Sequence, residues 1–135
     1  MKISAVRAAG RPPPPSEGGS ITLVAAGVMV AIAVVAMACA DVARTLTAAS
    51  TAQTAADAAA LAAAQELAFP GGTMSPDEIA AEYAARDGAE LLSCDCDPGA
   101  RSATVTVRAP VGQLLLFGAS RTVQAQARAE VDLPG

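Results

Sequence analysis

The chain has 135 residues, a formal net charge of −4, no histidine and no tryptophan. It is too short for several domains, and one tyrosine with two phenylalanines cannot build a large aromatic core. The lack of histidine removes the commonest acid–base residue and metal ligand, which argues against an enzyme. Acidic residues outnumber arginines after Arg44, so we do not expect binding of nucleic acid through a basic patch.

Residues 1–19 have the composition of a leader. Lys2, Arg7 and Arg11 make its first part basic, and a run of prolines followed by Glu-Gly-Gly completes it. Such a composition cannot form a packed element, so we expect a disordered segment. Because basic residues that flank a membrane span stay on the cytoplasmic side, the leader is predicted to be cytoplasmic. The part of the chain beyond the span is then extracytoplasmic.

A single long helix is predicted over Ser20–Ala68. Its first part, Ile21–Ala40, carries no charge and matches the ~20 residues that cross a bilayer as a helix. We therefore divide the chain into a leader (1–19), a transmembrane helix (20–41), an extracytoplasmic continuation of that helix (42–69) and a small head (70–135).

Two alternatives concern the end of the apolar run. Ala38-Cys39-Ala40 resembles a signal-peptidase site, although the apolar run is longer than the usual signal-peptide core. Lipidation of Cys39 is the second alternative, although Met37 fits a lipoprotein site poorly. In the membrane-helix interpretation, Cys39 is simply a small apolar residue.

Beyond the apolar run, apolar and small residues recur at alternating steps of four and three, which predicts a narrow packing stripe. The stripe consists of Val42, Leu46, Ala49, Gln53, Ala56, Ala60, Ala63 and Leu67. Small side chains let another helix approach closely, so we expect helix packing at Gln53, Ala56, Ala60 and Ala63. The stripe packs on the chain's own head, on another subunit, or on both. We expect another helix to pack closely against Ala56 and Ala60.

The head begins after a helix stop at Phe69–Gly72. Ser75–Glu78 has the pattern of a capping box with proline at the first helical position, which predicts a second helix ending near Arg86. Alternating apolar and polar residues then predict strands at about 90–94, 102–111 and 121–133. The predicted class is α+β: a long N-terminal transmembrane helix extends into a small head with a second helix and a three-stranded antiparallel sheet.

Two features lie at the edges of these elements. Asp41 and Arg44 follow the apolar run and mark the outer boundary between membrane and water. Leu114–Phe117, between the last two strands, is a loop too apolar to stay in water. It folds onto a helix or forms an exposed contact patch.

The sequence contains no recognisable catalytic constellation, so we expect no catalytic residues, no cofactor and no bound metal. Cys94 and Cys96, each followed by an aspartate, form the one ligand-like cluster. Outside the cytoplasm a disulfide between them is favoured over a metal site. On a regular strand their Cα separation is near the upper limit for a bridge, so the backbone is expected to bend before Pro98.

The leader, projecting helix and small β-rich head are arranged as in type IV pilin-like proteins. Within that group the chain resembles the TadE/TadG-like minor pilins of tight-adherence (Flp) pilus systems. The resemblance is carried by QTAADAAALAAA at Gln53–Ala64, similar to the motif beyond their membrane segment, and by Gly19-Ser20, where they have a Gly-Ser junction. It implies cleavage by a prepilin-type peptidase between Gly19 and Ser20, with Gly18–Gly19 as the nearby alternative.

One position departs from the pilin pattern. Processed pilins usually have glutamate as the fifth residue after the cleavage point, where it pairs with the N-terminal amine of a neighbouring subunit. Counting from Ser20, this chain has Val24 there. In lacking this glutamate the chain resembles an actinobacterial-type TadE-like subgroup found near helicase and secretion genes. It favours a minor or pseudopilin role over a bulk filament subunit.

The resemblance implies a structural minor pilin or pseudopilin-like subunit, or an assembly factor, of a Tad-type pilus or secretion-like envelope machine. Its expected partners are the membrane, other pilin-like subunits, assembly proteins and the prepilin-type peptidase, with no nucleic acid. The alternative is a generic single-pass or lipid-anchored extracytoplasmic binding protein.

Overall fold

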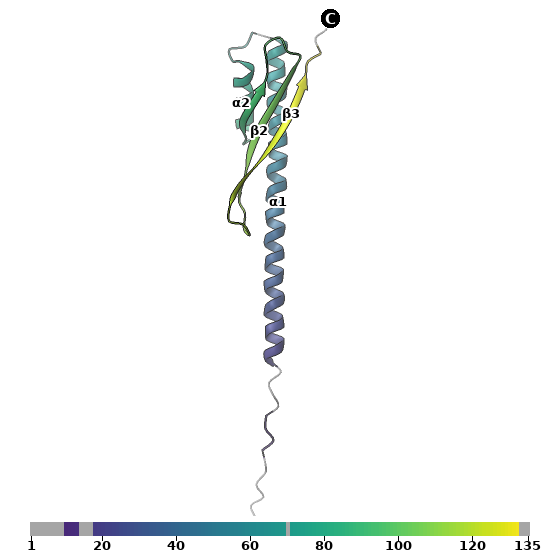
Figure 1. Ribbon diagram of the computed structural model, residues 1–135, viewed down its shortest axis with the longest axis vertical. Coiled ribbons are helices and arrows are strands. Elements are labelled where there is room, and N and C mark those ends of the chain that lie inside the picture. Colours follow the sequence, from purple (N-terminus) through teal and green to yellow (C-terminus); the bar gives the residue numbers. More distant parts are fainter. Residues whose placement is uncertain (1–9, 14–17, 70, 133–135) are drawn as a thin grey trace, which may run out of the picture. The chain divides into compact units, whose positions relative to one another are not determined.

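The computed structural model describes residues 10–13, 18–69 and 71–132. In chain order, its elements are α1 (Gly18–Ala68), α2 (Pro76–Arg86), β1 (Glu90–Asp95), β2 (Ser102–Gln113) and β3 (Ser120–Glu130) (Figure 1). They confirm the predicted α+β class. Residues 1–35 and 36–135 form two compact units, and α1 has residues in both. Most of the predicted leader, including Lys2 and Arg7, lies outside the described residues.

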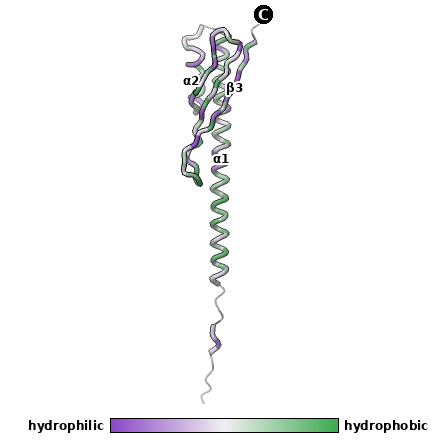
Figure 2. The backbone as a smooth tube through the Cα atoms, in the orientation of Figure 1, coloured by the Kyte–Doolittle hydropathy of each residue, from purple (hydrophilic) through white to green (hydrophobic). Residues whose placement is uncertain are grey.

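In the first unit, α1 presents apolar side chains to its surroundings. No residue from 19 to 35 is buried, and large side chains such as Ile21, Leu23 and Met29 are about three-quarters exposed. By length and composition the helix can cross a membrane. The core helix of a soluble protein would bury one of its faces, so the exposure of these apolar side chains fits a single-pass membrane anchor. Figure 2 shows the hydropathy of this part of α1.

In the second unit, the three strands form one antiparallel sheet in the order β1-β2-β3. The central strand, β2, alternates between buried and partly exposed residues along most of its length. Its inward side chains are those of Ala103, Val105, Val107 and Ala109, all fully buried. This alternation confirms the predicted period of two, in which one face of the sheet is covered and the other is open to solvent.

The covered face of the sheet packs on alanines. A single cluster joins the inward residues of β2 to alanines of both helices. These are Ala52, Ala55, Ala56, Ala59, Ala60, Ala63 and Ala64 of α1, with Ala80 and Ala84 of α2. Figure 1 shows the end of α1 behind the sheet, with α2 beside it. Alanine favours the helix and has no long side chain to hold the sheet away, so the backbones of helix and sheet lie close together.

This packing differs from the predicted stripe at its beginning. Ala56, Ala60 and Ala63 are buried, but Val42, Leu46 and Gln53 are exposed. The buried face instead starts at Asp41 and continues through Ala48 and Ala52. The large side chains of Val42 and Leu46 would hold the sheet away, so the smaller alanines face the sheet. A second chain's helix would reach the three buried alanines only if the head left them.

Helix α2 begins and ends as its sequence predicts. Ser75 is the N-cap, Pro76 follows, and the backbone N–H of Ser75 donates to the Glu78 carboxylate at 2.9 Å. That bond, with a second from the Ser75 hydroxyl, lowers the pKa of Glu78. Near the other end, Arg86 pairs with Glu82 one turn earlier. These contacts fix the start of α2 and the direction in which Ala80 and Ala84 face the core.

Substitution of Ala56 by leucine tests the closeness of this packing. Ala56 is fully buried between α1 and the sheet, so Ala56→Leu should lower the free energy of unfolding by about 1–3 kcal/mol through overpacking. Chemical denaturation of the full chain in detergent micelles measures this change. Gln53→Leu, at an exposed position of the same helix, is the matched control and should have little effect. Equal stability of the Ala56→Leu variant and the wild type would contradict the observed packing.

Candidate functional site

The predicted processing site lies at the very start of α1. The helix begins at Gly18, so the Gly19–Ser20 peptide bond is in its first turn. Gly19 and Ser20 are exposed, and a Cβ added to Gly19 would meet no other atom within 4 Å. The N–H groups of a first helical turn have no partners within the helix, so this turn can open at small cost. The position is therefore accessible, and cleavage there stays a prediction.

Cys94 and Cys96 are joined by a disulfide with a Cα–Cα distance of 5.4 Å. Cys94 lies on β1, opposite Val105 of β2, whereas Cys96 follows the last residue of the strand. Both side chains pack against the alanine–valine core. The bridge thus closes the end of an edge strand. Cys39, on α1, is free and exposed.

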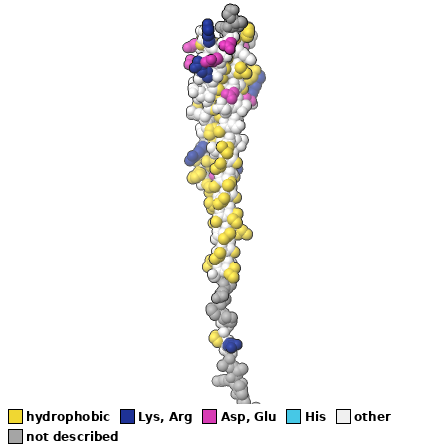
Figure 3. Space-filling model, turned by 90° about the vertical axis from the view of Figure 1, so that its right-hand side faces the viewer, with side chains coloured by type: hydrophobic (Ala, Val, Ile, Leu, Met, Phe, Trp, Pro, Cys, Tyr) yellow, Lys and Arg dark blue, Asp and Glu magenta, His cyan; other side chains and the backbone are white. Residues whose placement is uncertain are grey.

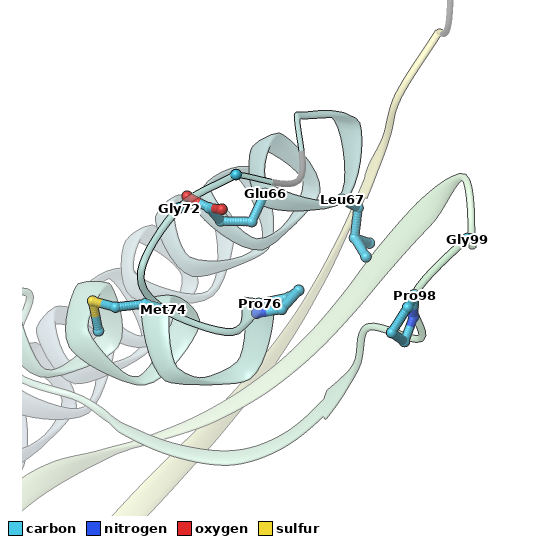
Figure 4. Close-up of a pocket in the computed structure, with 8 residues that line it drawn as sticks. Glu66, Leu67, Gly72, Met74, Pro76, Pro98 and Gly99 are labelled. Carbon is cyan, nitrogen blue, oxygen red and sulfur yellow. The ribbon is translucent and has the colours of Figure 1, made fainter.

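One hollow in the head, of about 320 Å³, lies between the end of α1, the start of α2 and the turn after β1 (Figure 4). Glu66 is its one charged lining residue, and its carboxylate lies so close to Gly72 that a Cβ there would be 2.6 Å from it. Among the described residues, no group of three or more Cys, Asp or Glu side chains is placed to hold a metal ion.

The most specific polar contact outside the regular elements joins α1 to the connection between β2 and β3. The Asp41 carboxylate accepts the backbone N–H of Leu115 at 2.7 Å and that of Leu116 at 3.0 Å. Arg44, one turn later on α1, donates to the carbonyl of Gln113 at 2.8 Å. Asp41 is only 6% exposed. We call this set of hydrogen bonds the Asp41 clamp.

The clamp holds the connection in a fixed turn. Gly118 donates its N–H to the carbonyl of Leu114 at 3.0 Å, and its φ of 58° lies in the left-handed region that glycine adopts without strain. The side chain of Leu114 is buried against Ala48 and Val111. Leu115, Leu116 and Phe117 follow with side chains 53%, 40% and 67% exposed. Both predicted outcomes for this loop are therefore found: its first residue folds onto the helix, and the next three form an exposed patch.

A comparison with known families gives a match over residues 19–66, to a family described as putative Flp pilus-assembly TadE/G-like. The chain carries a TadE/G-like domain. No curated protein and no solved structure matches the chain. The match supports involvement in the assembly of a Flp (Tad) pilus.

The TadE/G-like domain covers nearly all of α1 and ends before α2. It therefore contains the apolar run, Asp41 and the alanines of α1 that pack on the sheet. The strands that complete the core lie outside the matched residues. The matched residues form a single helix, which cannot bury its alanines without another element to pack against. In this chain the head supplies that element.

The sequence predicts a membrane boundary at Asp41 and an apolar loop at Leu114–Phe117, but it does not predict a contact between them. The carboxylate and the N–H groups are 74 and 75 residues apart, and no pattern in the chain links such distant positions. One signal was present. An aspartate directly after an uncharged run of membrane length is costly there unless it finds donors, so a donor-rich partner was to be expected.

Removal of the Asp41 carboxylate should release the turn. In Asp41→Ala the N–H groups of Leu115 and Leu116 lose a charged acceptor, and their hydrogen exchange should become roughly tenfold faster or more. Exchange measured by NMR or mass spectrometry on the full chain tests this. Asp57→Ala is the control, because Asp57 is exposed on the same helix and accepts a bond only from Gln53. Unchanged exchange at both amides in Asp41→Ala would show that the clamp does not hold the turn.

The thiols of Cys94 and Cys96 should resist alkylation in protein purified from the cell envelope without reductant. After reduction, mass spectrometry should show both of them labelled. Cys39 is the internal control, since it is free and should accept label in detergent before reduction. Labelling of Cys94 and Cys96 without reductant would exclude the bridge in the exported protein.

Proposed function

We propose that the chain is a structural, minor pilin-like or pseudopilin-like subunit of a Tad-type pilus or a related envelope machine, and that it is not an enzyme. The observation that supports this most strongly is that α1 has two different parts. Within the matched residues 19–66, the helix carries an exposed apolar run of membrane length and then an alanine surface buried by the head. A membrane helix that continues into the core of a small α+β head is the design of a subunit that is anchored first and assembled later.

In this proposal the N-terminus is cytoplasmic and the head is extracytoplasmic. Lys2, Arg7 and Arg11 precede the apolar run, whereas the head is acidic. A disulfide at Cys94–Cys96 is in keeping with an oxidising compartment for the head. The partners are the membrane, other pilin-like subunits and assembly proteins, and a prepilin-type peptidase that acts between Gly19 and Ser20.

The same proposal assigns a minor role. Val24 is an exposed apolar residue, and the run Ile21–Ala40 contains no carboxylate that could neutralise the amine of a neighbouring subunit. Repeated addition of identical subunits through such a pair is therefore not available to this chain. Incorporation beside subunits of a different sequence, or transient action during assembly, does not require the pair.

The N-terminus of the mature protein tests the proposal. In cells with an active prepilin-type peptidase, mass spectrometry should find Ser20 at the N-terminus of the wild-type protein. Gly19→Leu should leave a heavier, uncleaved protein. A side chain at Gly19 meets no neighbouring atom, so loss of cleavage in this variant would not come from a clash within the fold.

Gly27→Leu is the matched control. Gly27 lies in the same helix, and a Cβ there also meets no atom within 4 Å, so this variant should be cleaved like the wild type. An intact leader on the wild-type protein would contradict the processed-pilin proposal. An N-terminus at a lipidated Cys39 would instead establish the lipid-anchored alternative, in which most of the matched apolar run is removed.

A further inference from the structure

The exposed side chains beside the Asp41 clamp form an apolar patch that the fold holds in a defined position. The hairpin-tip patch consists of Leu115, Leu116 and Phe117 from the β2–β3 connection, with Ala38, Val42 and Leu46 from α1. Val42 and Leu46 are 59% and 66% exposed, and a shallow cleft of about 360 Å³ separates the two sets of side chains. Figure 2 shows the hydrophobic tip of the hairpin beside α1.

The backbone under this patch is well bonded, although its side chains are left open. The Asp41 carboxylate accepts hydrogen bonds from two N–H groups of the tip, and Arg44 donates a hydrogen bond to the carbonyl of Gln113 before it. Several large apolar side chains presented together on a fixed backbone indicate a surface that binds something apolar.

The position of the patch along α1 indicates what it binds. Asp41 is the first charged residue after the uncharged run Ile21–Ala40. A helix of that length rises about 30 Å, which is the thickness of the hydrocarbon core of a bilayer. The Asp41 carboxylate then lies at the membrane surface, and the N–H groups that it binds place the tip at the same level. The patch is therefore placed next to the end of the uncharged run.

The charges around the patch fit the same environment. The guanidinium of Arg121 lies 5.7 Å from the ring centroid of Phe117, and Arg44 lies on the neighbouring turn of α1. The one carboxylate beside the patch, that of Asp41, is already occupied by two N–H donors. On the face seen in Figure 3, most acidic side chains lie toward the other end of the head. Aromatic and aliphatic side chains bordered by arginines suit the boundary between acyl chains and lipid headgroups, where the apolar parts can face the acyl chains and the guanidinium groups can face phosphate.

We propose that the hairpin-tip patch inserts into the lipid headgroup layer, so that the head contacts the membrane surface at a second place besides α1. This inference rests on the proposed membrane span of α1. A lipid surface fits better than a second copy of the chain, because the patch has six side chains. A stable protein interface uses roughly 20–30 residues on each side.

Depth-dependent quenching tests the inference on the full chain in vesicles. In a Cys39→Ala background, Leu116→Cys, Phe117→Cys, Leu92→Cys and Val30→Cys are each labelled with an environment-sensitive fluorophore. The vesicles contain phosphatidylcholine with or without phosphatidylglycerol, and a nitroxide near the headgroup or deep in the acyl chain. Leu92 is the matched control, because this leucine of the head is 39% exposed, against 40% for Leu116.

We expect the shallow nitroxide to quench labels at positions 116 and 117 at least about twofold, more strongly with phosphatidylglycerol, and to leave position 92 unquenched. Position 30 should be quenched by the deep nitroxide. Lack of quenching at 116 and 117, with quenching at 30, overturns the inference and leaves the membrane span standing. Lack of quenching at 30 overturns the span itself. The fluorophores at 116 and 117 could instead report an apolar environment only at a high ratio of protein to lipid and lose it on dilution with lipid. That result would assign the patch to contact between copies of the chain and would also overturn the inference.

Discussion

The sheet of this protein has one apolar face, and the contact that covers it is made by alanine. A head of about 60 residues buries only a marginal amount of surface by itself. The helix that crosses the proposed membrane span supplies the missing layer, with Ala52, Ala56 and Ala60 fully buried against Val105 and Val107. The placement of the strands and of α2 depends on this contact. The strands must face α1, α2 must close the remaining side, and the head cannot leave α1 without exposing its core.

The Asp41 clamp extends the same contact toward the beginning of the head. The alanine core ends near Ala48, and beyond it the β2–β3 hairpin would be a free ribbon of two strands. Such ribbons are marginally stable in water. Three hydrogen bonds attach the end of the ribbon to α1: two backbone N–H groups of the ribbon donate to the Asp41 carboxylate, and Arg44 donates to one of its carbonyls. The hairpin is therefore held at both ends, by apolar contact at one and by hydrogen bonds at the other.

Much of this fold could be predicted from local patterns. The capping box at Ser75, the alternation along β2 and the turn at Asp97–Ala100, closed by an N–H to carbonyl bond, are each encoded within a few neighbouring residues. The predicted stripe on α1 coincides with the buried face only where alanines dominate. Near Val42 and Leu46 the rule that large apolar residues face inward fails, because a helix that leaves a membrane has apolar surroundings on its outside too. The partner of Asp41 was beyond local patterns altogether, since contact between distant segments depends on the length and twist of the intervening sheet.

The attachment of the hairpin at both ends has a mechanical consequence. In the second unit, β2 and β3 run alongside α1, as Figure 1 shows. A pull on α1 along its axis would therefore slide the helix past the strands and load the buried alanine contacts and the Asp41 clamp together. Contacts loaded side by side share the force, whereas contacts peeled from one end break in succession. A part built in this way resists traction along its helix better than traction across it.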